Sequence, residues 1–105
     1  MPHVIEYNAT NSEEATKKYA KIITLLNIKN VYDTLKACDV LKFIILELNN
    51  NIGIKHKITD YGVDKIEFEN AIEEMASNAL KDICLLTNTA KPSIEDVKNI
   101  YKSLI

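Results

Sequence analysis

Apolar residues recur at intervals of three and four along most of the chain, which is the spacing of an amphipathic α-helix. The pattern predicts a helical protein with about four main helices, over about residues 12–26, 31–50, 64–83 and 94–104. The widest apolar surface falls on residues 31–50, where it exceeds the single face of an ordinary surface helix. We therefore expect this helix to be central and to be contacted from several sides. Its apolar positions are Leu35, Ala37, Cys38, Val40, Leu41, Ile44, Ile45 and Leu48.

Residues typical of helix caps precede the predicted helices. Asn11 with Glu14, and Asp64 with Glu67, have the spacing of a capping box, in which two side chains satisfy free backbone N–H groups at a helix start. Before residue 11 the apolar lead-in is too short to be assigned to a helix or a strand. The sequence therefore predicts that the first helix begins after Asn11.

Further polar residues mark the ends of the first two helices. Asn27 is expected to end the first helix, since asparagine tolerates the left-handed conformation better than most residues. Asn30 and Asp33 can cap the start of the second helix.

The stretch from Ala79 to Asp96 predicts the end of one helix, an irregular loop and the start of another helix. The apolar repeat stops at Thr87-Asn88-Thr89, whose side chains compete for backbone hydrogen bonds and favour turns. Pro92 disfavours the helical conformation at the preceding residue, and Ser93 can then cap the last helix. This loop is longer than a helix connection requires, so we expect functional residues in it.

Together these elements predict an all-α helical bundle. Residues 1–105 contain neither an internal repeat nor a low-complexity linker, and we expect them to form a single helical domain.

Composition narrows the possible functions. The net charge is −2 and all 13 cationic side chains are lysines, so nucleic acid is not an expected partner and the bidentate anion contacts of arginine are lacking. A signal peptide and a membrane span are not predicted either, because the longest wholly apolar run is Phe43–Leu46. With only two cysteines, the sequence predicts a soluble, reduced, cytoplasmic domain.

Few residues could carry chemistry. His3 and His56 are the only histidines, and neither has a second ligand at helical spacing, so no metal site and no catalytic residue is predicted. His56 lies between two lysines and is expected on the surface, whereas His3 is expected to have a packing role. The acidic pairs are expected to be solvated helix faces, and Cys38 is expected in the core.

Cys84 falls at the predicted end of a helix. There it is expected to be a small buried residue that packs, as most free cysteines do. Strong activation of its thiol is not expected, because Asp82 is close in sequence and a helix C-terminus disfavours a thiolate. A nucleophilic role is therefore not expected for this residue.

Several segments resemble one known family, the iron-containing (group III) alcohol dehydrogenases. The run Lys81-Asp82-Ile83-Cys84, then Thr87-Asn88, then Pro92–Val97 and Ile100-Tyr101, is similar to the C-terminal signature of that family. Pro2–Ala9 resembles the family's Leu-Pro-x-Val-x-x-Phe/Tyr-Asn segment. Lys18-Tyr19-Ala20, Asn51–Ile54 and Tyr61-Gly62-Val63 fall between them in the family's order. The chain departs from the family at Asn88-Thr89-Ala90, where Asn-Pro-Arg is usual.

The resemblance implies a dehydroquinate synthase-like alcohol dehydrogenase C-terminal domain, in part, without the N-terminal nucleotide-binding domain. Family members transfer hydride between an alcohol and NAD(P) with iron or another divalent metal, so these cofactors belong to the implied full-length enzyme and not to this chain. The family's metal ligands, one Asp and three His, lie upstream of the matched segments. Cys84 would then border the substrate and cofactor pocket.

Two functions remain open at this point. In the first, the chain is a C-terminal fragment or domain of such an enzyme, inactive by itself, with the missing nucleotide-binding portion as its partner and possible self-association. In the second, it is a stand-alone helical protein-interaction module without enzymatic activity, since its caps and apolar stripes look sufficient for folding alone.

Overall fold

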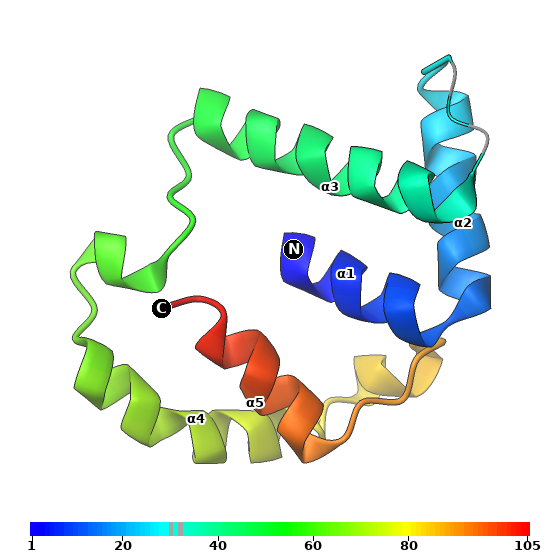
Figure 1. The fold of residues 1–105 in the computed structure, drawn as a ribbon. Helices are drawn as coiled ribbons and strands as arrows, with labels where there is room; N and C mark the ends of the chain where they lie inside the picture. Colours follow the sequence, from blue (N-terminus) through cyan, green and yellow to red (C-terminus); the bar gives the residue numbers. More distant parts are fainter. Residues whose placement is uncertain (30, 32) are drawn as a thin grey trace. The chain divides into compact units, whose positions relative to one another are not determined.

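The computed structural model describes residues 1–29, 31 and 33–105. Throughout these residues the regular structure is helical and no strand is formed, which confirms the all-α prediction (Figure 1). In chain order the elements are α1 (Pro2–Asn11), α2 (Glu13–Leu25), α3 (Thr34–Asn51), the 3₁₀ helix η1 (Ile58–Tyr61), α4 (Lys65–Ala79), the 3₁₀ helix η2 (Ile83–Thr87) and α5 (Ile94–Lys102). They form two compact units, Met1–Ile52 and Gly53–Ile105. That the chain is one domain stays a prediction.

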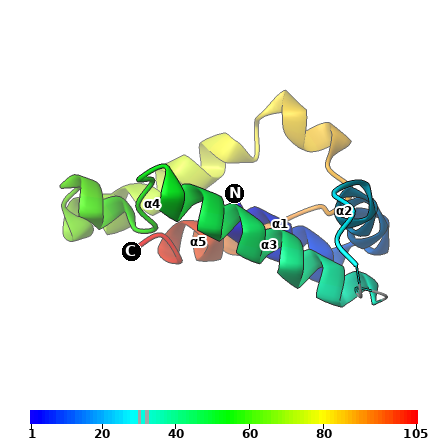
Figure 2. The ribbon, with the colours of Figure 1, turned by 90° about the horizontal axis from the view of Figure 1, so that it is seen from above.

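The first unit consists of α1, α2 and α3, each in contact with the other two. Helix α3 runs antiparallel to α1, and α2 crosses near one end of both (Figures 1 and 2). The core of the unit is a cluster of Ile5, Ile23, Ala37 and Leu41. Helix α3 contributes two of the four and is contacted by both α1 and α2, whereas its central place among the predicted four helices stays a prediction. The outer ends of its apolar stripe, Leu35 and Leu48, are exposed.

The start of the chain differs from the sequence-based prediction. The lead-in is a helix, α1, and Asn11 is its last residue, where the side-chain amide donates to the carbonyl of Tyr7 at 2.8 Å. Asn11 therefore cannot cap the next helix, and the prediction of a box with Glu14 was wrong. Ser12 takes that role: its backbone is extended, and its hydroxyl accepts from the Ala15 N–H at 3.1 Å.

The remaining caps of the first unit follow the prediction where they are described. Asn27 has φ 57°, so it adopts the expected left-handed conformation just after α2. Asp33 caps α3, accepting from the N–H groups of Leu35 and Lys36 at 2.8 and 3.1 Å. The predicted contribution of Asn30 lies outside the described residues.

The second unit contains η1, α4, η2 and α5, with α4 packed against α5. The rings of Phe68 and Tyr101 meet edge to face, with centroids 6.4 Å apart. Lys98 of α5 forms ion pairs with Glu73 of α4 and with Glu95 one turn before it, the latter at 2.9 Å. Glu73, one of the acidic residues expected on a solvated helix face, thus also joins α4 to α5 through an ion pair.

Both helix starts of this unit carry the predicted cap residue, but one predicted box is incomplete and the end of α4 differs. Asp64 caps α4 by accepting from the Glu67 N–H at 2.9 Å, whereas the return bond from the Glu67 side chain is not formed in the described residues. Ser93 with Asp96 forms a complete capping box at α5. Helix α4, however, ends at Ala79 and not near Ile83. The chain makes a turn there and starts a separate short helix, η2.

Within the described residues, no helix combines the length and the apolar character that crossing a bilayer requires.

Candidate functional site

The segment that sequence analysis singled out is built around η2. Asp82 precedes it in an extended conformation, and its carboxylate accepts from the Cys84 N–H at 2.8 Å. An aspartate at this position satisfies a backbone donor that a helix start leaves free. Asp82 therefore fixes where η2 begins.

Side chains also hold the far end of η2. The hydroxyl of Thr87 donates to the carbonyl of Cys84 at 3.0 Å. The ammonium group of Lys91 donates to the Leu86 carbonyl at 2.8 Å and lies 3.5 Å from the Leu85 carbonyl. The Asn88 amide donates to the Ala90 carbonyl at 2.7 Å, which shapes the loop in between. The first part of the expected irregular loop is thus the short helix η2, and side-chain hydrogen bonds of Thr87, Asn88 and Lys91 hold its end and the turn that follows.

Cys84 is exposed in this segment. Its reading as a buried packing residue is therefore not supported, whereas its place in the lining of a substrate and cofactor pocket stays a prediction. Hydrogen bonding of the Cys84 thiol to the Asp82 carboxylate, and the negative charge of that carboxylate, raise the pKa of the thiol. A raised pKa keeps the thiol protonated near neutral pH, which agrees with the expected lack of activation.

A small hollow of about 180 Å³ lies beside η2. Its walls come from the end of α4, from η2 and from the loop before α5, and its lining residues are Leu80, Asp82, Leu85, Leu86, Lys91 and Pro92. Two large apolar side chains of η2, Ile83 and Leu86, are 76% and 73% exposed. The segment therefore presents apolar surface next to one carboxylate and one ammonium group.

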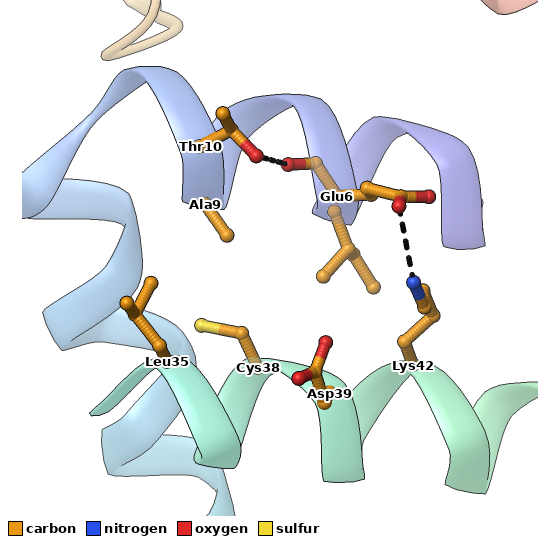
Figure 3. Close-up of a pocket in the computed structure, with 8 residues that line it drawn as sticks. Glu6, Ala9, Thr10, Leu35, Cys38, Asp39 and Lys42 are labelled. Atoms are coloured by element: carbon orange, nitrogen blue, oxygen red, sulfur yellow. Dashed lines mark hydrogen bonds and ion pairs between the residues drawn. The ribbon is translucent and has the colours of Figure 1, made fainter. Parts of the chain in front are cut away.

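A second hollow, of about 250 Å³, lies between α1 and α3 (Figure 3). Ile5, Ala9 and Cys38 form its apolar part, while Glu6 and Lys42 face each other across its rim as an ion pair of 3.3 Å. The Cys38 thiol donates to the Thr16 carbonyl at 3.8 Å, and burial raises its pKa. Cys38 is buried as predicted, so this thiol is part of the packing of the first unit.

The histidines do not come together with other ligands. His56 is exposed, as predicted, and His3 is partly buried on α1 in the other unit. Across residues 1–29, 31 and 33–105, no three His, Cys, Asp or Glu side chains form a group that could hold a metal ion. The donor set of these residues therefore does not fit an iron site.

The role of one residue of the segment, Lys91, was not predicted from the sequence. Lys91 was considered only as the residue before Pro92, yet it provides the cation at the end of η2. A lysine four residues beyond the end of a short helix is a weak signal in sequence, because most lysines at such positions extend into solvent.

Comparison with known proteins agrees with the resemblance noted in the sequence. The model of the Fe-containing alcohol dehydrogenase family, C-terminal part, matches residues 1–105. The chain therefore belongs to the iron-containing alcohol dehydrogenase family and corresponds to its helical C-terminal part.

Three curated relatives show how much of such a protein the chain covers. An alcohol dehydrogenase of Thermococcus barophilus is 31% identical over 97% of this chain and 24% of its own length. An NADPH-dependent butanol dehydrogenase of Clostridium saccharobutylicum is 28% identical over 97% of this chain and 25% of its own. A lactaldehyde reductase of Escherichia coli K12 is 30% identical over 96% and 25%. The chain thus spans about a quarter of the length of these relatives.

Proposed function

We propose that this chain serves as the C-terminal helical part of a metal-dependent NAD(P) alcohol dehydrogenase, which transfers hydride between an alcohol or aldehyde carbon and nicotinamide in the cytoplasm. The observation that carries the proposal is the family match along the whole chain, residues 1–105. The relatives named above are a butanol dehydrogenase, an alcohol dehydrogenase and a lactaldehyde reductase, which supports small alcohols and aldehydes as the substrate class.

The contribution that we assign to this chain is structural. Asp82 at one end of η2 and Lys91 at the other give the segment that carries Cys84 a defined shape. The protonated, exposed thiol of Cys84 and the apolar side chains of Ile83 and Leu86 suit contact with an uncharged part of a substrate or cofactor. In the proposed enzyme this surface is one wall of the substrate and cofactor pocket.

The chain is assigned no step at the metal or in hydride transfer. Its described residues do not assemble a metal site, and the nicotinamide and the iron are proposed for the enzyme as a whole. Its proposed partner is the nucleotide-binding portion of the same enzyme.

The DNA sequence that flanks the gene and an activity assay test the proposal together. We expect the sequence immediately upstream to encode a nucleotide-binding portion. We also expect alcohol-dependent formation of reduced nicotinamide when that portion is combined with this chain, Fe²⁺ and NAD⁺ or NADP⁺. The chain without that portion should show none. An unrelated upstream sequence, together with specific capture of a different protein by a monomeric chain, would contradict the proposal and favour the helical interaction module.

A further inference from the structure

The C-terminal end of η2 is held by a side chain from outside the helix. A short helix leaves its last carbonyl groups without partners inside the helix. Lys91 lies beyond the turn that follows η2, and its ammonium group reaches back to the carbonyls of Leu86 and Leu85, at 2.8 and 3.5 Å. A lysine ammonium group has three donors and a positive charge, which suits the negative end of a helix.

The chain around Lys91 favours this contact. Pro92 follows it directly and disfavours a helical backbone at Lys91, so the last helix cannot extend backwards and carry the side chain away. The Leu85 carbonyl also accepts from the Asn88 N–H at 3.1 Å, so the lysine and the turn converge on the same end of η2. Lys91 and Leu86 both line the hollow beside the segment.

We propose that Lys91 is a positioning residue for the pocket wall: by binding the last carbonyls of η2, it fixes the segment that presents Cys84 and Leu86. This inference rests on the proposed function for its role in an enzyme, but the contact itself can be tested without any activity. Lys91 does not touch the reacting atoms in this proposal. It acts through the shape of η2.

Amide hydrogen exchange of the 105-residue chain, measured by NMR, tests the contact. In Lys91→Met, which keeps the aliphatic stem and removes the charge, the amides of Leu85 and Asn88 should exchange about five-fold faster, because local opening of η2 becomes easier. Their hydrogen bonds, to Asp82 and Leu85 carbonyls, report on η2 directly. The Leu80 amide, bonded to Ala76 in α4, should be unaffected.

Two further variants make the result specific. Lys91→Arg keeps the charge and should restore exchange rates to within about two-fold of the unmodified chain. Lys81→Met removes an exposed charge from a residue that precedes η2 in the sequence. Among the contacts described, the ammonium group of Lys81 approaches only the Asn78 side chain. This substitution should leave the Leu85 and Asn88 amides unchanged. Equal effects of Lys81→Met and Lys91→Met, or the absence of any effect, would overturn the proposal.

Steady-state kinetics of the assembled enzyme test the role in the pocket. Lys91→Met should lower kcat/KM for the alcohol about five-fold, and Lys91→Arg should recover it. Faster exchange at η2 with unchanged kcat/KM would overturn the positioning role. If the unmodified assembly has no alcohol-dependent activity, the proposed function fails, whereas the exchange rates still decide whether Lys91 holds η2.

Discussion

The core of the first unit offers a sharp test of the fold. Leu41 on α3 is only 6% exposed and belongs to the cluster with Ile5, Ile23 and Ala37. Leu41→Ala removes the equivalent of three methyl or methylene groups, each worth about 0.8 kcal/mol of transfer free energy. Because neighbouring helices cannot close the resulting space fully, a cavity term adds to this loss. We expect the free energy of unfolding to fall by about 3 kcal/mol, within the usual range of about 2–5 kcal/mol.

The same helix supplies a matched control. Leu48 is 54% exposed, so Leu48→Ala makes the identical chemical change where most of the side chain is already in water. It should cost less than about 1 kcal/mol. Urea unfolding of the 105-residue chain, followed by circular dichroism at the helical band, measures both variants. A loss below about 0.5 kcal/mol for Leu41→Ala, or equal losses for the two variants, would show that Leu41 is not at the centre of the packing.

Four other predictions concern the cap of α5, an ion pair, metal binding and the proposed pocket. Ser93→Ala should destabilise the second unit by about 1 kcal/mol in urea unfolding, whereas Ser93→Asp should preserve the cap. Glu73 and Glu95 raise the pKa of Lys98, so the charged lysine should stabilise the fold at about pH 9 and lose this contribution as the pH rises past about 10.5. The urea midpoint of the unmodified chain should therefore exceed that of Lys98→Met at about pH 9, and the difference should become smaller above about pH 10.5. After dialysis the purified chain should retain less than about 0.1 equivalent of iron or zinc, and stoichiometric metal that His3→Ala removes would contradict this. In the assembled enzyme, Cys84→Trp should lower alcohol oxidation by crowding the pocket with helicity unchanged, while Cys84→Ser, which tests thiol chemistry at similar size, should retain it.

The helices with strong local signals were predictable from the sequence. Asp64 and Ser93 each follow a turn and precede a clear apolar repeat, and both act as caps. Asn27 adopts the left-handed conformation that its side chain tolerates. In these places the local preference of the residue and its tertiary environment favour the same structure.

Helix α1 could not be predicted in the same way. Among its buried residues only Ile5 is apolar, and its C-terminal residues, Thr10 and Asn11, are poor helix formers. Both side chains donate to carbonyls four residues earlier in the helix, and α1 packs on α2 and α3. Tertiary packing therefore outweighs the weak local preference. Once α1 includes Asn11, the cap of α2 has to move to Ser12.

The position of the candidate segment was predicted from the sequence, whereas its structure as a short helix, η2, was not. The sequence placed an unusual segment around Cys84 and Asp82, and both residues lie in η2 or at its cap. The form of η2 depends on Asp82, which accepts from the Cys84 N–H at its start, and on Lys91, which donates to the Leu86 carbonyl at its end. Such contacts between a side chain and a specific carbonyl have no periodic signature, so hydrophobic patterning cannot reveal them.

The hydrogen bond from the Ile58 N–H to the Leu104 carbonyl, at 2.8 Å, joins the two ends of the second unit. Contacts between residues far apart in sequence form only after the entropy of closing the intervening loop has been lost, whereas α4 and α5 are built from local contacts. During folding of this unit, we therefore expect α4 and α5 to form and pair before η1 docks on the end of the chain. Removing Leu104 and Ile105 should then accelerate unfolding while leaving the rate of folding nearly unchanged, since the lost contact forms after the transition state.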